Sequence, residues 1–234
     1  MVGVVNITPD SFSDGGTFFN STRAIEHCLE LNEAGADVVD IGAESSRPGA
    51  DPVSAEIEKE RILPVLQKVR KHLSIPISVD TTKSTVARAV LMEGADIIND
   101  ISAFRSDPEM AQVVSEWKAG VVLMHMRGSP KTMQQMPPSK DILKEISVYL
   151  KGAISKALEN GVAKDRLVID PGIGFGKTVE DNLKILNQLQ FLRAFKLPVL
   201  VGTSRKSFLG KILNQSVKKR IWGTAASVAL AILR

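Results

Sequence analysis

Residues 34–40 read Ala34-Gly35-Ala36-Asp37-Val38-Val39-Asp40, and residues 93–99 repeat the pattern as Glu93-Gly94-Ala95-Asp96-Ile97-Ile98-Asn99. In both stretches a glycine follows a helical pattern, at the position where helices commonly end. A short β-branched run then begins and closes on a polar residue. Two copies of the same helix-to-strand junction predict a fold that is built from repeated βα units.

The same alternation extends along the whole chain. The predicted strands are Val2–Ile7, Val38–Gly42, Ile77–Asp80, Ile97–Asn99, Val121–Met124, Leu167–Asp170 and Val199–Gly202. The predicted helices are Ser21–Asn32, Ser54–His72, Ser84–Glu93, Pro108–Lys118, Asp141–Asn160, Glu180–Phe195 and Val217–Leu233. The near-continuous apolar character of the strands is typical of a parallel sheet buried on both faces. No linker divides these segments, so we expect residues 1–234 to form a single domain.

Polar residues end almost every predicted strand. They are Asn6, Asp40, Asp80, Asn99, His125 and Asp170. In a parallel barrel all these strand ends open onto one face, where the βα loops build the site. An open doubly wound sheet would instead build its site from two neighbouring loops. The sequence therefore favours an α/β fold of the (β/α)₈ TIM-barrel type, with its site at the carboxyl ends of the strands.

The pattern contains seven strands, so we expect the eighth βα unit of the barrel to be missing from these 234 residues. An eighth strand would bond to both the first and the seventh strands. Without it, Val2–Ile7 and Val199–Gly202 would each present an edge of unpaired backbone groups. Because such edges favour pairing with another chain, we expect a homodimer.

Composition limits the classes of partner. The net charge is +4, but the basic residues are scattered and the chain has only one Tyr and two Trp, which disfavours nucleic acid. The longest apolar stretch, residues 225–233, is too short for a membrane span, and no signal peptide is found. A single cysteine, Cys28, predicts a core residue without a disulfide, and we expect a cytoplasmic location.

Two long polar segments, residues 6–16 and 44–50, each follow a predicted strand. Ordinary connections have a median length of about 4–6 residues, so these segments are candidate active-site loops. Arg47 lies between Ser46 and Pro48 in the second segment. Its planar guanidinium suits a phosphate or carboxylate group, since it can bond to two oxygens at once.

Seven motifs in order resemble the successive signatures of the dihydropteroate synthase family. They cover residues 6–16, 44–49, 78–81, 97–101, 123–126, 170–177 and 202–207, and thus most of the chain. The resemblance implies a (β/α)₈ barrel that joins 6-hydroxymethyl-7,8-dihydropterin diphosphate to 4-aminobenzoate, with Mg²⁺ as the cofactor. It also places an Arg-x-His motif on the eighth strand, which we do not find in this sequence, and a threonine where this chain has Ser46.

The resemblance also implies a role for each candidate residue. The pterin would contact Asp80, Asn99, Asp170 and Lys206, and Asn6 would contact the metal. The phosphates and 4-aminobenzoate would contact Ser46, Arg47, Pro48, Phe175 and Ser207. Read on their own, carboxylates and an amide at strand ends fit the paired N–H groups of a pterin edge, because an analogue without those donors leaves a buried carboxylate unpaired. The alternative role for Asp80 or Asp170 is to cap the next helix.

Two other functions are compatible with these motifs. The first is a non-catalytic or truncated pterin-binding module, which the missing eighth unit would favour. The second is another pterin-barrel transferase, such as a methyl-tetrahydrofolate-dependent methyltransferase. The methyltransferases share the pterin-facing carboxylate and amide, but they need neither the Ser46–Pro48 motif nor the motif at residues 204–207, so both motifs argue against that function.

Overall fold

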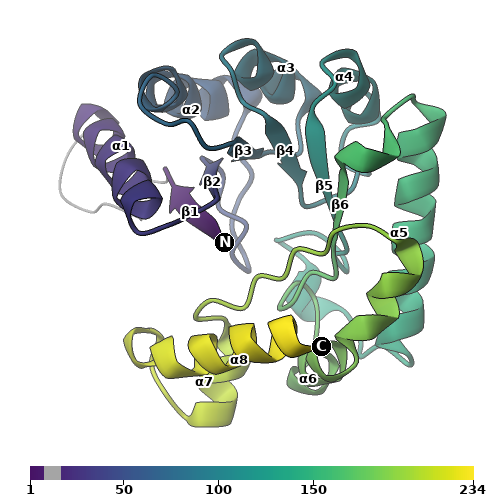
Figure 1. Ribbon diagram of the computed structural model, residues 1–234. Helices are drawn as coiled ribbons and strands as arrows, with labels where there is room; N and C mark the ends of the chain where they lie inside the picture. Colours follow the sequence, from purple (N-terminus) through teal and green to yellow (C-terminus); the bar gives the residue numbers. More distant parts are fainter. Residues whose placement is uncertain (8–16) are drawn as a thin grey trace.

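The computed structural model describes residues 1–7 and 17–234, with side chains from residue 21 in the second range. Its framework is a parallel sheet whose strands follow one another in chain order (Figure 1). The strands are β1 (Val2–Asn6), β2 (Val38–Gly42), β3 (Ile77–Asp80), β4 (Ile97–Asp100), β5 (Gly120–Met124) and β6 (Leu167–Asp170). The candidate loop at residues 8–16 lies outside the described residues.

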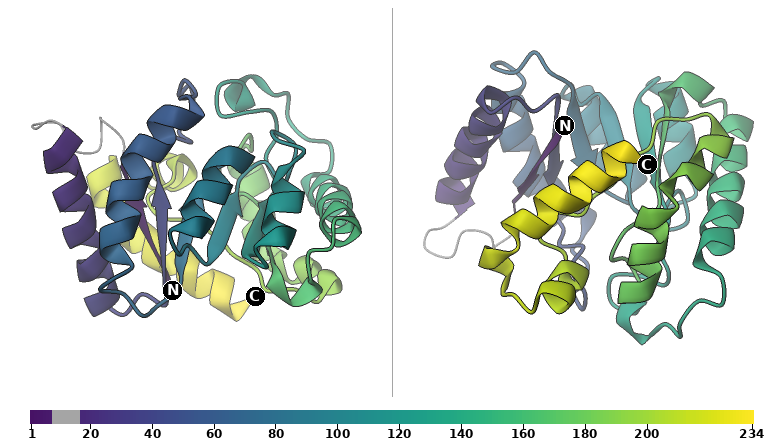
Figure 2. Two further views of the ribbon diagram at one scale, coloured as in Figure 1. Left: turned by 90° about the horizontal axis from the view of Figure 1, so that it is seen from above. Right: turned by 60° about the horizontal axis from the view of Figure 1, so that its bottom comes forward.

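Helices connect the strands and cover the convex side of the curved sheet (Figure 1). They are α1 (Thr17–Glu33), α2 (Ala55–Val69), α3 (Ser84–Met92), α4 (Met110–Glu116) and α5 (Ile142–Glu159). After β6 follow α6 (Val179–Asn187), α7 (Ser207–Leu213) and α8 (Ile221–Leu233). Figure 2 shows α8 beside α6, on the opposite side of the molecule from α2–α4. No helix among the described residues is long and apolar enough to cross a bilayer.

The main core lies between the sheet and α1–α5. Alternate strand residues, among them Ile41, Val79 and Ile98, are fully buried against these helices. Cys28 of α1 is buried in this core, as predicted. Burial of these apolar side chains supplies the main driving force for folding, at about 25 cal/mol per Å² removed from water. The six strands and their order thus agree with the sequence prediction.

The structure corrects the prediction after β6. The expected strand Val199–Gly202 is reduced to a single bridge, in which Val199 pairs with Ile169. Two backbone hydrogen bonds make this pairing, from Ile169 N to Pro198 O at 3.0 Å and from Leu200 N to Ile169 O at 2.9 Å. Pro198 has no N–H to donate, and Lys196, two residues before it, adopts a left-handed conformation with φ of 53°. The sheet that the structure describes is therefore open between β1 and this segment.

Two predicted helices are also shorter than expected. The stretch Glu180–Phe195 divides into α6 and a 3₁₀ helix at Leu189–Phe195, and Val217–Leu233 divides into a 3₁₀ turn at Val217–Lys219 and α8. The predicted helices did not include α7, which begins at Ser207. Apolar periodicity does not distinguish a continuous helix from two short ones in a single stretch.

Candidate active site

The strand register aligns the carboxyl ends of the first four strands. Asn6 pairs with Gly42, Gly42 with Asp80, and Asp80 with Asn99. A Cβ atom at Gly42 would lie 3.6 Å from Asn6 Oδ1 and 3.7 Å from Asp80 Oδ2. Paired residues of parallel strands direct their side chains to the same side of the sheet, so Asn6 and Asp80 converge over this glycine.

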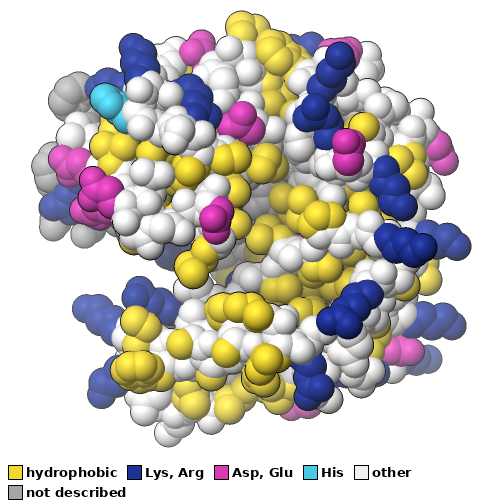
Figure 3. All heavy atoms as spheres, in the orientation of Figure 1, with side chains coloured by type: hydrophobic (Ala, Val, Ile, Leu, Met, Phe, Trp, Pro, Cys, Tyr) yellow, Lys and Arg dark blue, Asp and Glu magenta, His cyan; other side chains and the backbone are white. Residues whose placement is uncertain are grey.

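The same alternation brings Asp170 to this side of the sheet. Asn99 pairs with Val122, and Val122 with Val168. Asp170 is two residues beyond Val168, and strand side chains alternate with a period of two. The ends of β1, β3, β4 and β6 therefore carry polar side chains on the inner face, opposite to α1–α5. Figure 3 shows the molecular surface hollowed between the part over α1 and β1 and the part over α7 and α8.

A hydrogen bond to Asp40 fixes the orientation of the Asn99 side chain. The Asn99 Nδ2 atom donates to Asp40 Oδ2 at 3.1 Å, which leaves the side-chain oxygen of Asn99, Oδ1, available as an acceptor. Asp40 is buried and its Oδ1 atom has no hydrogen-bond partner. Burial raises the pKa of Asp40, while its hydrogen bonds oppose that change. Burial, together with the nearby carboxylates of Asp40, Glu58, Asp100 and Glu44, raises the pKa of Asp80 well above its usual range.

Asp170 lies beside two lysines at the end of β6. Its Oδ1 atom accepts from Gly172 N at 2.6 Å. Burial raises the pKa of this carboxyl, and the charges of Lys206 and Lys177 lower it in part. The Lys206 Nζ atom donates to Ile173 O at 2.5 Å and lies 4.7 Å from the centre of the Phe175 ring, while burial lowers the pKa of Lys206 to about 8. Asp170, Lys206 and Phe175 thus form one group.

Neither aspartate caps the helix that follows it. Helix α3 begins at Ser84 after Lys83, and α6 is capped by Thr178. The capping alternative for Asp80 and Asp170 is therefore wrong.

The segment after β2 brings Ser46 towards Asp80. Ser46 and Asp80 line the same small pocket, together with Glu44, Ser45, Glu58, Thr81, Thr82 and Ile101. Arg47 and Pro48 are exposed at the tip of this segment, and Ser207 is exposed at the start of α7. The structure thus places Ser46 next to the carboxylates of the inner face, whereas Arg47, Pro48 and Ser207 are exposed and do not line this pocket.

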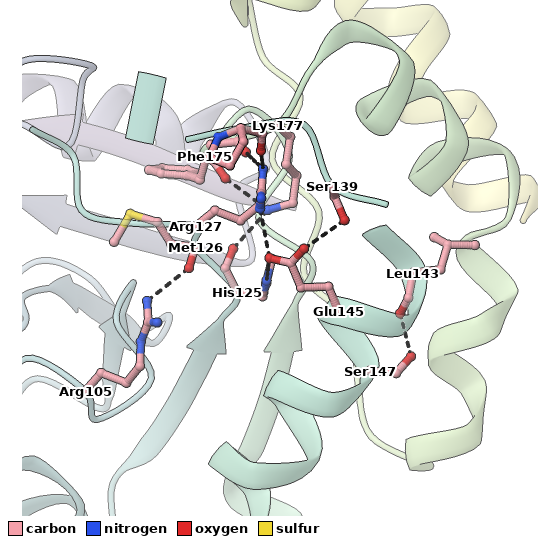
Figure 4. Close-up of polar contacts among 12 residues, drawn as sticks. Arg105, His125, Met126, Arg127, Ser139, Leu143, Glu145, Ser147, Phe175 and Lys177 are labelled. Atoms are coloured by element: carbon pink, nitrogen blue, oxygen red, sulfur yellow. Dashed lines mark hydrogen bonds and ion pairs between the residues drawn. The ribbon is translucent and has the colours of Figure 1, made fainter. Parts of the chain in front are cut away.

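The sequence prediction missed a polar cluster beneath the Phe175 loop (Figure 4). Arg127 is almost fully buried, and its Nε atom donates to Glu145 Oε1 at 2.8 Å. The Lys177 Nζ atom donates to His125 O at 3.2 Å and to Phe175 O at 3.1 Å. Lys177 ends the motif at residues 170–177, but Arg127 and Glu145 are 18 residues apart, on a loop and a helix, with no shared motif.

Burial explains the charge states in this cluster. Burial and the nearby cations Lys177, Arg105 and Arg127 lower the pKa of His125 to about 2, so the ring is neutral at pH 7. Burial also lowers the pKa of Lys177 to about 7, although Asp170 and Glu145 oppose that change. Lys177 is therefore a lysine that changes its charge near neutral pH.

Lys177 gives a testable pH dependence of stability. Between about pH 7 and its ordinary pKa of 10.5, unfolded Lys177 is protonated and folded Lys177 is mostly neutral. Since the unfolded state then binds more protons, Lys177 makes the unfolding free energy rise with pH in this window, by at most about 1.4 kcal/mol per pH unit. Urea titrations from pH 6 to 9 should show that Lys177→Met removes this contribution. Replacing the exposed Lys151 by Met should leave the slope unchanged, and equal slopes for both variants would contradict the assignment.

The fold and this site define a βα-repeat protein with a polar site at the carboxyl ends of its strands, where enzymes of this architecture have their active sites. A family model described as pterin binding enzyme matches residues 2–234. The dihydropteroate synthase of Synechocystis is 46% identical over 99% of this chain and 81% of its own length. A Yersinia pestis dihydropteroate synthase, solved in complex with a sulfonamide drug, has a TM-score of 0.93 and 39% identity over 99% of this chain and 84% of that one.

A further solved structure is similar to the chain over almost the same extent. The Xanthomonas albilineans dihydropteroate synthase with 4-aminobenzoic acid has a TM-score of 0.92 and 42% identity, over 98% of this chain and 82% of that one. These similarities extend over nearly all of the chain, at identities well above those at which only the fold can be inferred. The chain belongs to the dihydropteroate synthase family, and it is a transferase with the TIM-barrel type of fold.

Proposed function

We propose that this chain joins 6-hydroxymethyl-7,8-dihydropterin diphosphate to 4-aminobenzoate, giving 7,8-dihydropteroate and diphosphate. The amine nitrogen forms a bond to the exocyclic methylene carbon while the carbon–oxygen bond to diphosphate breaks. The nitrogen then loses a proton to water. An arylamine is neutral at pH 7, so the attack needs no strong general base. The observation that carries this proposal is the convergence of Asp80, Asn99, Asp170 and Lys206 around one inner face, in a chain of this family.

The inner face fits the hydrogen-bonding edge of a pterin. Asp170 retains a second carboxylate oxygen beside the one that accepts from Gly172, and Asn99 retains its carbonyl oxygen. These acceptors match the paired N–H donors of the ring. The Lys206 ammonium can donate to a ring oxygen or nitrogen from the opposite side. Buried acceptors of this kind discriminate strongly against ligands that lack the donors.

The remaining candidate residues suit the second substrate and the leaving group. Arg47 and Ser46 are assigned to the phosphates or to the carboxylate of 4-aminobenzoate, with Pro48 beside them. Phe175 offers a ring face to the benzene ring, and Ser207 a hydroxyl to the carboxylate. Cationic and hydroxyl groups aimed at the departing diphosphate stabilise the charge that develops there, which is usually the largest catalytic contribution.

We assign Mg²⁺ to a site that Asn6 would share with water and the substrate phosphates, and not to a site made only of protein ligands. The described residues contain no group of three or more His, Cys, Asp or Glu that could hold a metal ion. Mg²⁺ commonly keeps several waters and binds one or two protein oxygens together with substrate phosphates. The exposed Asn6 carboxamide oxygen beside Asp80 could be such a ligand. When bound, the ion would neutralise charge on the diphosphate.

We further propose a cytoplasmic homodimer. Support for the dimer comes from exposed apolar side chains on α8, where Trp222 is 82% and Ile232 is 79% exposed. An apolar face of this kind is typical of a surface that contacts a partner. The single buried thiol of Cys28 agrees with a reducing compartment. Sedimentation of the pure protein tests the dimer.

Diphosphate release tests the reaction itself. The protein is incubated with both substrates and Mg²⁺, and the released diphosphate is measured. We expect release only when both substrates are present. A non-catalytic pterin-binding module would bind the pterin in calorimetry without release, and a methyl-tetrahydrofolate-dependent methyltransferase would also give none. Either result would contradict the proposal.

A further inference from the structure

A partly buried ion cluster lies at the base of the segment that carries Arg47: Glu58 is fully buried, and Lys83 and Glu44 are each 23% exposed. The Lys83 Nζ atom is 2.5 Å from Glu44 Oε2 and 2.6 Å from Glu58 Oε2. Glu44 follows β2, Glu58 belongs to α2, and Lys83 precedes α3. One ammonium group therefore joins three separate parts of the chain.

Glu58 depends on Lys83 for its charge balance. The Glu58 side chain is fully buried, and its Oε1 atom has no hydrogen-bond partner. Lys83 is the cation that bonds to it in the described part of the chain. Removing one partner of a buried ion pair usually destabilises a protein by several kcal/mol, because the other charge remains buried. This contact by itself would give Lys83 a purely structural role.

Glu44 gives the cluster a second role, because its carboxylate links the two ends of the loop at residues 44–53. The same Oε2 atom that bonds to Lys83 also accepts from Val53 N at 3.1 Å. Glu44 and Val53 bracket the segment that contains Ser46 and Arg47. The position of Lys83 therefore sets the position of both ends of this segment.

The tip of the segment has weaker contacts. Gly49 N donates to Pro130 O at 3.0 Å, and Lys131 pairs with Asp51 at 2.7 Å. The Lys131 and Asp51 side chains are 66% and 79% exposed, and ion pairs that exposed contribute little to stability. The contacts at the base, which are much less exposed, are thus the stronger of the two attachments.

The cluster also borders the inner face. Glu44, Glu58 and Asp80 line one pocket with Ser46. The charges of Glu44 and Glu58 act on Asp80, and Lys83 compensates both of them. A shift of Lys83 would therefore move Ser46 and Arg47 relative to Asp80.

We propose that Lys83 is a positioning residue: through Glu44 it fixes the base of segment 44–53 and so presents Ser46 and Arg47 to the phosphate and 4-aminobenzoate part of the site. This role rests on the proposed function. It concerns the second substrate more than the pterin, because of the four residues assigned to the pterin only Asp80 borders the cluster, whereas Asn99, Asp170 and Lys206 lie outside it.

Two variants separate this role from charge balance. Lys83→Met alone leaves Glu58 unpaired and could lose the fold, so the comparison is between Glu58→Gln and the double variant Lys83→Met/Glu58→Gln. Both lack the buried Glu58 charge, and they differ only at Lys83. Relative to Glu58→Gln, the double variant should raise the KM for 4-aminobenzoate roughly tenfold or more, since small displacements of positioning groups have effects of this size. Calorimetric affinity for 6-hydroxymethylpterin should change much less.

Amide hydrogen exchange gives a readout that does not depend on activity. Residues 44–53 should exchange faster in the double variant, and Lys83→Arg in the Glu58→Gln background should restore both slow exchange and the KM. Unchanged KM and unchanged exchange in the double variant would overturn the role of Lys83. If the wild-type protein releases no diphosphate, the proposed function fails, while the exchange comparison still tests the attachment of the loop.

Discussion

Replacing Asp170 by asparagine is expected to weaken pterin binding about 10- to 100-fold, or roughly 1–3 kcal/mol. Asp170 is buried and already accepts from Gly172 N at 2.6 Å. An asparagine can keep this bond with its carbonyl oxygen, but its NH₂ group then faces the N–H donors of the ligand. If the side chain flips, the ligand regains its acceptor and the Gly172 amide loses one.

Titration calorimetry with 6-hydroxymethylpterin measures this effect. The matched control is Asp165→Asn, the same chemical change at an exposed residue shortly before β6. The control should bind like the wild type. Unchanged affinity in Asp170→Asn would show that this carboxylate serves only to hold the turn at Gly172.

Replacing Gly172 by alanine should have the largest effect on stability. Gly172 has φ of 68°, and a Cβ atom there would lie 1.9 Å from the His125 carbonyl oxygen. A left-handed conformation costs a residue with a Cβ about 1–2 kcal/mol, and relieving such an overlap costs roughly 1–3 kcal/mol more. We therefore expect the unfolding free energy to fall by about 2–5 kcal/mol. The displaced turn would also move the Gly172 amide away from Asp170 and weaken pterin binding.

Urea unfolding of Gly172→Ala beside Gly152→Ala measures this cost. Gly152 lies within α5, and a Cβ atom there would have no neighbour within 4 Å. Alanine at this position should stabilise the protein by roughly 0.5–1 kcal/mol, because glycine is a poor helix former. Equal stability of the two variants would mean that the turn at Gly172 adjusts without strain.

The sequence predicted most of the fold because the relevant signal is local. The bounds of β2, β3 and β6 agree with the apolar runs that predicted them. Each run is buried on its helix-facing side, and a strand buried in this way is recognised from its run of β-branched residues alone. The segment Val199–Gly202 carries the same pattern but forms only one bridge. Pairing also depends on the backbone on either side, which the apolar pattern does not describe.

The polar residues that end the strands and form the candidate site could also be predicted from the sequence. A polar residue that closes a buried strand is expected at the face where parallel strands end, and alternation with a period of two fixes its side. The sequence could not show that Asn99 bonds to Asp40, 59 residues away, or that Lys83 joins Glu44 to Glu58. Such pairs have no characteristic spacing along the chain.

The sequence by itself determined the order of the βα units, the polar strand ends and the family motifs, since these depend on neighbouring residues and their periodicity. Only the tertiary structure decided which charges are buried together, and hence the pKa values of Asp80, His125 and Lys177. The physical reason is that desolvation and Coulomb interactions depend on distances in space and on exclusion of water. Packing sets both between residues that are far apart in the chain.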